Sequence, residues 1–177
     1  MGKAKRLRAK VDAPPDTWIR RTARAAWARR EPVMWAAIFA LVIAVQWPML
    51  KGYYYRATGA PAPASAITWR ADLDGALAEA RSANKKGVIV DFYASWCPPC
   101  IAMKHEVWPD RTVAEAVNAD YVAVQVDADR DQVLSARYRV ESLPTVLLLD
   151  ASGRVIKRNE GFLPQSGILR MLAETGN

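Results

Sequence analysis

The sequence is poor in cysteine and histidine, and this scarcity limits the metal chemistry of the chain. Its 177 residues include two cysteines, Cys97 and Cys100, and one histidine, His105. A structural zinc site needs four ligands, commonly supplied as two pairs, and no second cysteine pair exists. One metal alternative stays open, a soft copper site in which His105 and Met103 join the two thiols. We otherwise expect no metal and no cofactor.

An excess of basic over acidic residues is missing from the chain outside its N-terminus. The net charge is +7, and residues 1–30 carry ten Lys and Arg against two Asp. Residues 66–177 carry thirteen Lys and Arg against fifteen Asp and Glu. A nucleic-acid-binding domain normally has a basic face of its own. We therefore expect no nucleic-acid partner.

A run of 19 residues at 32–50, PVMWAAIFALVIAVQWPML, contains no charge. At about 1.5 Å per residue, a helix of this length crosses a hydrocarbon core. Trp35 and Trp47 lie near its two ends, as is typical of rings at membrane interfaces. We predict a transmembrane helix over residues 32–50. The alternative is a cleaved signal peptide, but small-residue sites such as 60–62 lie more than ten residues beyond the run.

The charges around this run predict its orientation. Ten basic residues precede it, whereas only Lys51 and Arg56 follow it closely. The positive-inside rule then keeps the N-terminus in the cytoplasm and places the C-terminal part in the periplasm, anchored to the inner membrane. Residues 1–31 form a basic tail, in which an interfacial helix capped by Asp16 or Thr17 and a disordered segment are both open. Residues 51–66 are predicted as a Pro/Ala-rich linker, and residues 67–177 as one domain.

Residues 67–177 alternate between strand and helix patterns. Short apolar runs predict strands at 87–94, 121–128 and 145–150, with a paired strand at 154–160. Helices are expected at 73–84, from the cysteines to Val107, at 130–139 and at 164–175. Residues 111–118 form either another helix or a continuation beyond Pro109. We predict an α/β domain with a central mixed β-sheet flanked by helices.

The spacing of Cys97 and Cys100 favours a redox pair over a structural bridge. A disulfide across so short a loop contributes only about 2 kcal/mol through chain entropy. A helix that begins at Cys97 instead places this thiol where free N–H groups and the helix dipole stabilise a thiolate. Cys100, one turn later, is placed to attack a mixed disulfide at Cys97, and Trp96 would cover one side of the sulfurs. Because Pro98 and Pro99 lack N–H groups, we expect a less depressed Cys97 pKa than with a non-proline at position 98.

Two further residues complete the candidate site. Asp91 is the single charge in its apolar strand, six residues before Cys97, and a buried carboxylate there would take a proton from Cys100. The alternative is an aspartate that faces solvent at a sheet edge. Pro144 precedes a buried strand, where a cis Leu143–Pro144 bond would offer backbone to a substrate segment. Here the alternative is a proline that merely starts the strand.

With Asp91, Trp96-Cys97-Pro-Pro-Cys100 and Leu143-Pro144-Thr145 in this order, residues 66–177 resemble the thioredoxin superfamily. They are most similar to the C-terminal periplasmic domain of the thiol:disulfide interchange protein DsbD and to other membrane-anchored thioredoxin-like proteins. The resemblance implies a thioredoxin fold with an extra N-terminal helix. It implies these site residues: Cys97 as attacking thiol, Cys100 as resolving thiol, Asp91 as proton acceptor, and Trp96, Leu143, Pro144 and Thr145 as the substrate groove.

The chain departs from the family pattern at two places. Cytosolic thioredoxin has a lysine beside its buried aspartate, and the corresponding position here is expected at Ala123 or a neighbour, in a strand without lysine. The Pro98–Pro99 pair also differs from the usual residues between the cysteines, so the resemblance does not carry the redox potential or the direction of exchange.

The expected function is that of a membrane-anchored periplasmic thiol:disulfide oxidoreductase. We expect it to reduce disulfides of exported proteins through Cys97 and Cys100, with a membrane electron carrier as its reductant. The alternatives are a disulfide oxidase or isomerase, and a thioredoxin-fold copper-binding assembly factor.

Overall fold

The computed structural model describes residues 16–174, with side chains from residue 31 onward. Its contacts divide the chain into two compact units, Met1–Val45 and Gln46–Asn177, which are described separately below. Helix α1 (Asp16–Thr58) belongs to both units. Its portion Glu31–Thr58 is long and apolar enough to cross a membrane by length and composition. The candidate helix predicted over residues 32–50 therefore exists.

Helix α1 corrects the expected start of the linker. We predicted a Pro/Ala-rich linker from residue 51, but residues 51–58 are helical. The helix ends at Thr58, and the next residue, Gly59, has a φ of 63°, in the left-handed region that stops many helices. Contacts with the domain accompany this extra length, because Lys51, Gly52, Tyr55 and Arg56 all contact residues 96–106. The sequence pattern does not reveal these contacts.

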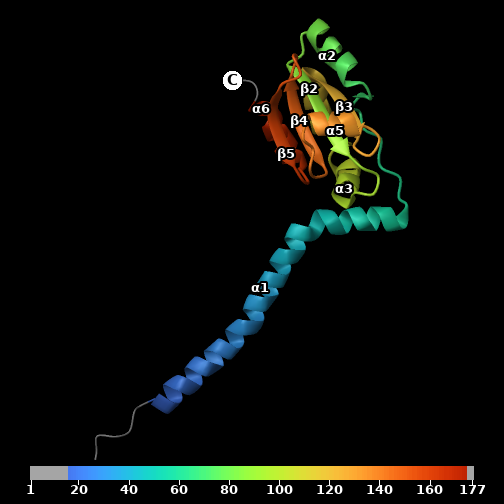
Figure 1. Cartoon of the computed structure of the whole chain (residues 1–177). Helices are drawn as coiled ribbons and strands as arrows, with labels where there is room; N and C mark the ends of the chain where they lie inside the picture. Colours follow the sequence, from blue (N-terminus) through green and yellow to red (C-terminus); the bar gives the residue numbers. More distant parts are fainter. Residues whose placement is uncertain (1–15, 175–177) are drawn as a thin grey trace, which may run out of the picture. The chain divides into compact units, whose positions relative to one another are not determined.

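The second unit is built on a five-stranded mixed sheet with the order β1-β3-β2-β4-β5 (Figure 1). The central strand β2 (Gly87–Tyr93) runs parallel to β3 (Tyr121–Asp127) and antiparallel to β4 (Thr145–Asp150). Strand β5 (Val155–Glu160) pairs antiparallel with β4. The short strand β1 (Trp69–Arg70), which we did not predict, pairs with β3. The predicted mixed sheet is thus confirmed.

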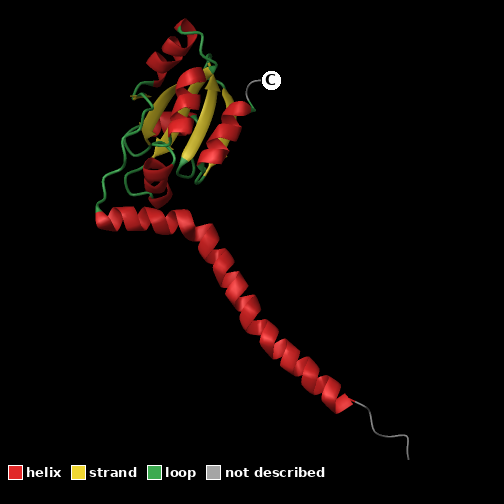
Figure 2. Ribbon diagram, turned by 180° about the vertical axis from the view of Figure 1, so that it is seen from behind, coloured by secondary structure: helices red, strands yellow, loops and turns green. Residues whose placement is uncertain are grey.

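Five helices of this unit lie on both faces of the sheet (Figure 2). Helices α3, α4 and α6 pack on one face, and helices α2 and α5 on the other. Asp110 caps a separate helix α4 through Val113 N, so residues 111–118 do not continue α3. The bounds are α2 (Leu73–Ser82), α3 (Pro98–Glu106), α4 (Arg111–Asp120), α5 (Gln132–Arg137) and α6 (Gln165–Ala173).

The alternation of β2 places its residues in two different apolar layers. Val88, Val90 and Phe92 pack with α2 and α5, whereas Ile89 packs with α3, α4 and α6. Because side chains alternate along a strand, Asp91 lies on the same face as Ile89. The sheet therefore carries one carboxylate into an otherwise apolar layer.

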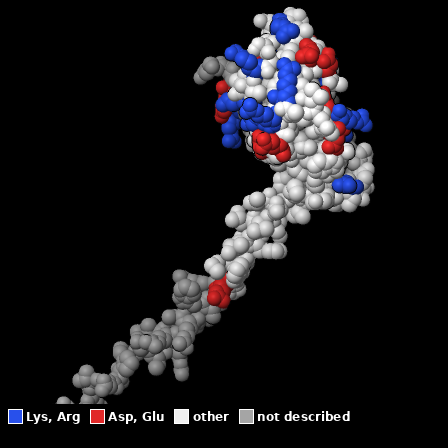
Figure 3. All heavy atoms as spheres, in the orientation of Figure 1, with Lys and Arg blue, Asp and Glu red and all other residues white. Residues whose placement is uncertain are grey.

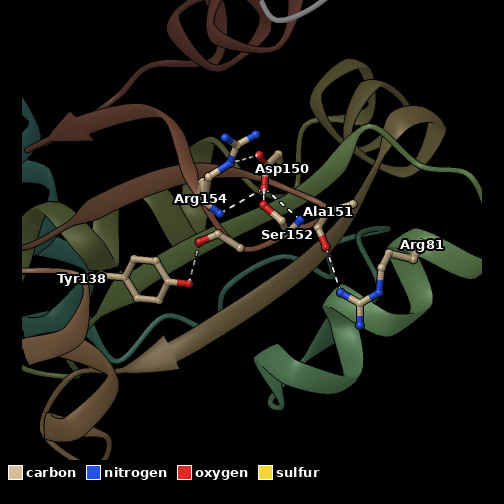
Figure 4. A network of polar contacts seen from close by, with 7 residues as sticks. Arg81, Tyr138, Asp150, Ala151, Ser152 and Arg154 are labelled. Atoms are coloured by element: carbon tan, nitrogen blue, oxygen red, sulfur yellow. Dashed lines mark hydrogen bonds and ion pairs between the residues drawn. The ribbon is translucent and has the colours of Figure 1, made fainter.

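A network of polar contacts closes the turn between β4 and β5, at the opposite end of β2 from the cysteines (Figure 4). Asp150 accepts hydrogen bonds from Ser152 Oγ at 2.6 Å and from Arg154 Nε at 2.8 Å. Arg81 donates to the Ala151 carbonyl and Tyr138 to the Gly153 carbonyl. The hydrogen bonds that Asp150 accepts, first that of the Ser152 side chain and then those of Arg154, hold the pKa of Asp150 well below its usual value. The turn is therefore tied to α2 and to the end of α5.

Candidate active site

The cysteine pair lies where β2 passes into α3. Cys97 N donates to the Ala94 carbonyl at 3.2 Å, and Cys97 is the N-cap residue of α3. Cys97 and Cys100 form a disulfide with a Cα–Cα distance of 5.3 Å. Both cysteines are buried, together with Ala94 and against Leu143. The structure therefore brings the predicted pair to the N-terminus of a helix.

The two prolines restrict the hydrogen bonds available to Cys97. Pro98 and Pro99 occupy the first two helical positions, and neither has an N–H group. Cys97 Sγ accepts a hydrogen bond from Cys100 N, at 3.3 Å. As expected from the sequence, the helix end offers the sulfur its first backbone donor only at Cys100.

Trp96 is the exposed residue of the site, with 54% of its surface accessible. Its indole Nε1 donates to Asp129 Oδ2 at 2.8 Å, which orients the ring. Sequence reasoning identified Trp96 but missed Asp129. That residue follows the end of β3, and β3 pairs in parallel with β2, so both residues lie beyond the same edge of the sheet.

Asp91 is buried beneath the cysteines, with 2% of its surface accessible. It lies in the central strand of the sheet, so the alternative of a solvent-facing edge residue is wrong. Burial raises the pKa of Asp91 to about 6. Gln125 Nε2, which donates to Asp91 Oδ2 at 3.0 Å, partly opposes this effect. The buried Trp108 side chain also lowers this pKa, although its Nε1 has no hydrogen-bond partner within the described residues.

Gln125 is a site residue that the sequence analysis missed. Gln125 pairs with Asp91, whereas Ala123, where we expected the counterpart of the family's lysine, pairs with Ile89. A neutral amide therefore lies beside Asp91, in a strand without lysine. Counting along β3 could not find this residue without the register between β2 and β3.

A cavity of about 580 Å³ joins Asp91 to Cys100. Its lining includes Gln125 and Tyr93 near the carboxylate, and Lys104 and Arg130 among its charged residues. Water in such a polar cavity can carry a proton between the carboxyl group and the thiol. The arrangement therefore fits Asp91 as the proton acceptor for Cys100, directly or through water.

Residues 143–145 meet the cysteines at the same sheet edge, because β4 begins where the antiparallel β2 ends. The Leu143–Pro144 peptide bond is cis. Leu143 packs against the cysteine cluster, and Thr145 is buried with its hydroxyl bonded to the Ser142 carbonyl at 2.7 Å. The predicted cis bond is therefore present, and the role of residues 143–145 as a substrate groove stays a prediction.

The two other candidates for a copper site make contacts of their own. Met103 packs in the apolar layer with Trp108 and Ile168. The ring of His105 stacks on Tyr55, with a centroid distance of 4.0 Å, and lines the same cavity as Cys100. Among the described residues, no group of three or more His, Cys, Asp and Glu side chains could hold a metal ion.

Comparison with known proteins agrees with this geometry. The family model described as a thioredoxin-like domain matches residues 73–176. A thioredoxin from Mycoplasmoides gallisepticum is 36% identical over 109 residues, which cover 60% of this chain and 96% of that protein. The match to the family model covers the cysteine pair, Asp91 and Pro144.

Solved structures show the same fold. A thioredoxin from Thermus thermophilus is 29% identical, with a TM-score of 0.55, and the match covers 62% of this chain and 86% of that one. The reduced C-terminal domain of DsbD from Neisseria meningitidis is 23% identical, with a TM-score of 0.51, over 58% of this chain and 93% of that one. The latter likeness shows the fold alone. With a Cys-x-x-Cys disulfide at the start of α3, this chain belongs to the thioredoxin-like family and is a thiol:disulfide oxidoreductase.

Proposed function

We propose that this chain is a single-pass inner-membrane protein whose thioredoxin-like domain lies in the periplasm and reduces disulfides of exported proteins. The observation that carries the proposal is the Cys97–Cys100 pair above a buried Asp91, in a domain that continues from an apolar helix. The domain boundaries then follow: a basic tail at 1–31, a membrane helix at 32–50, a connection at 51–66 and the catalytic domain at 67–177.

Charge supports the membrane part of the proposal. Residues 32–50 carry no charge, and Figure 3 shows a stretch of helix drawn without charged side chains. The large hydrophobic side chains there, such as Trp35, Phe39 and Val45, are more than half exposed. Lys51 instead forms an ion pair with Glu106 of the domain, so the membrane-spanning part ends before it. The ten basic residues ahead of the span favour a cytoplasmic N-terminus.

The start of α3 supports reduction as the direction of exchange. A strongly oxidising pair has a reduced form that is stabilised, chiefly through the thiolate of its attacking cysteine. Pro98 and Pro99 deprive Cys97 of two backbone donors. The thiolate is then less stabilised, and the dithiol gives up its electrons more readily.

The mechanism follows from the positions of the side chains. The Cys97 thiolate attacks a substrate disulfide, forms a bond to one substrate sulfur and releases the other as a thiolate. Asp91 takes the proton of Cys100 through the shared cavity. The Cys100 thiolate then attacks Cys97 Sγ, which releases the second substrate thiol and leaves the Cys97–Cys100 disulfide. Trp96, Leu143, Pro144 and Thr145 would hold the substrate segment beside the pair.

Each turnover leaves the pair oxidised, so the cycle needs a reductant outside the cytoplasm. We propose a membrane dithiol carrier, which would return two electrons by the reverse exchange.

Trapping of partners tests the exchange reaction. A Cys100→Ser chain cannot resolve the mixed disulfide, so exported proteins should accumulate in covalent adducts that dithiothreitol dissolves. Cys97→Ser is the matched control and should give none. If no adduct forms and the purified domain retains copper instead, the exchange proposal is wrong and the copper-binding alternative stands.

The resting redox state tests the direction, and the reagent tests the side of the membrane. A membrane-impermeant maleimide added to intact cells with a permeabilised outer membrane should label Cys97 in the wild-type chain. Labelling requires free thiols in the periplasm, as expected of a reductase kept reduced. A pair that is fully oxidised in untreated cells would reverse the direction to oxidase, and labelling only after lysis would contradict the location.

A further inference from the structure

Residues 51–56 of α1 lie against the helix that carries the cysteines. Lys51 Nζ is 2.7 Å from Glu106 Oε2, and Tyr55 donates to Glu106 Oε1 at 2.8 Å. The Tyr55 ring also stacks on His105, with planes 5° apart. We call residues 51–56 the covering segment. It contacts the last turn of α3 through an ion pair, a hydrogen bond and a ring stack.

Gly52 brings the covering segment to the first turn of α3. This glycine is buried, and a Cβ atom built on it would lie 1.9 Å from the carbonyl oxygen of Pro98. No side chain larger than hydrogen fits there, so the helix backbones touch directly. Pro98, which follows Cys97, is itself buried.

Arg56 extends the same contact to the other neighbour of Cys97. Its Nη1 donates to the carbonyl oxygen of Trp96 at 3.3 Å. The segment therefore contacts the residue before Cys97 and the residue after it. Cys97 itself has 2% of its surface accessible.

We infer that the covering segment determines which substrates reach Cys97: it admits small thiols and disulfides and restricts bulky, folded proteins. Attack on a protein disulfide needs room for the flanking backbone beside Cys97, as well as a line of approach to sulfur. The segment lies on both neighbours of Cys97, so a folded partner meets it first. Gly52, Tyr55 and Arg56 would act as specificity-determining residues through their position beside the reacting sulfur.

The restriction has a simple thermodynamic form. If folded proteins react only with chains whose segment has moved away from α3, their rate scales with the fraction of such chains. A substitution that weakens the contact raises this fraction. It leaves reagents small enough to pass the segment nearly unaffected.

Two maleimides of different size test this inference on the full-length chain in detergent micelles, in a Cys100→Ser background. Gly52→Leu should raise the rate at which a 5 kDa polyethylene glycol maleimide modifies Cys97 by about tenfold. The rate with N-ethylmaleimide should change by less than about twofold. Tyr53→Leu is the control, because Tyr53 lies exposed on another face of the same helix.

Glu106→Ala is a second variant that removes the partner of both Lys51 and Tyr55 without adding bulk. It should also raise the rate of the bulky reagent, and it decides the question if Gly52→Leu does not fold, as judged by circular dichroism. An unchanged bulky-reagent rate in the folded variants overturns the inference. So does an equal increase for both reagents, which would mean altered thiol reactivity in place of altered access.

The inference rests on the proposed function, in which Cys97 is the attacking thiol. An assay of insulin reduction by the same variants, with Cys100 restored, distinguishes failure of the inference from failure of that function. Faster insulin reduction with the Gly52→Leu chain supports both. If the bulky maleimide reacts faster but no variant reduces insulin, the reductase function fails while the covering role stands. If the wild-type chain reduces insulin and the labelling rates do not change, the covering role fails alone.

Discussion

Asp91 lies in β2 among apolar side chains of the same layer and beside one neutral amide, that of Gln125. Its folded-state pKa is raised from 3.8 to about 6 by burial. Between about pH 4 and pH 6 the folded chain therefore holds this proton more tightly than the unfolded chain does. The free energy of unfolding falls as pH rises through this window, by up to about 3 kcal/mol. The site is thus a source of instability at neutral pH.

Asp91→Asn should stabilise the oxidised chain at pH 7 by about 1–3 kcal/mol, because the amide carries no charge to desolvate. The gain should become small near pH 4, where Asp91 is protonated in the folded chain and about half protonated in the unfolded chain. Urea unfolding of both chains at pH 4 and pH 7 measures it. An equal gain at the two pH values would show that charge burial is not its cause.

Gln125 should set the pH at which the resolving step begins to slow. The rate of Cys100 attack should fall below about pH 6 as Asp91 becomes protonated. Gln125→Lys places a cation beside Asp91 and should move this midpoint to lower pH by one unit or more. Gln125→Leu removes the hydrogen bond from Nε2 and should move it upward. Stopped-flow decay of a mixed disulfide at a series of pH values provides the midpoints, and shifts of the same sign would contradict the assignment.

At this scale the sequence was sufficient for residues whose role is written in a local motif. Sequence patterns predict Cys97, Cys100, Asp91 and Pro144, and the structure brings these residues together where β2 ends and β4 begins. Gln125 was not predicted, because its contact with Asp91 depends on the register of two strands far apart in the chain.

At the scale of elements, we expect the turn between β4 and β5 to contribute to the free energy of unfolding and not to catalysis. Asp150 accepts hydrogen bonds from both the backbone and the side chains of Ser152 and Arg154. Its depressed pKa means that this stabilisation is present above about pH 4 and is lost as pH falls towards the native pKa.

Asp150→Ala should lower the free energy of unfolding at pH 7 by about 1–2 kcal/mol, the usual cost of hydrogen bonds left unmade. The turn lies at the opposite end of the sheet from Cys97, so the rate of insulin reduction should stay the same. Thermal unfolding and the insulin assay test the two parts. A loss of activity in the folded variant would show coupling along β4.

The order and type of the longer elements followed from apolar periodicity and from turn residues. The exceptions have physical causes. Strand β1 has two residues, too few for any period to show. Residues 51–58 contain three tyrosines, which do not mark a helix or a turn strongly, and they contact α3 through Tyr55 and His105. Local composition therefore does not predict that this part of the expected linker is helical.

At the scale of the whole molecule, the two units differ in charge. The first carries ten Lys and Arg against three Asp and Glu and includes most of the uncharged run, whereas the second carries fifteen of each and is neutral overall. This asymmetry orients the chain in a membrane under the proposed function, and it also provides a test.

Replacement of Arg20, Arg21, Arg24, Arg29 and Arg30 by Gln should weaken the orientation signal. A fraction of the chains should then place the C-terminal domain in the cytoplasm. An alkaline phosphatase fused to the C-terminus, active only outside the cytoplasm, should lose activity relative to the unaltered chain. Unchanged phosphatase activity would show that these arginines do not decide the topology.

The direct backbone contact between Gly52 and Pro98 has a genetic consequence. One codon separates a chain whose cysteine is covered from a chain whose cysteine is open, and nearly every missense change in that codon acts in the same direction. In cells that lack another reductase for bulky exported proteins, selection for restored growth should recover changes at Gly52 repeatedly. Retention of glycine at position 52 would then indicate that cells benefit when this enzyme is kept from reacting with most proteins.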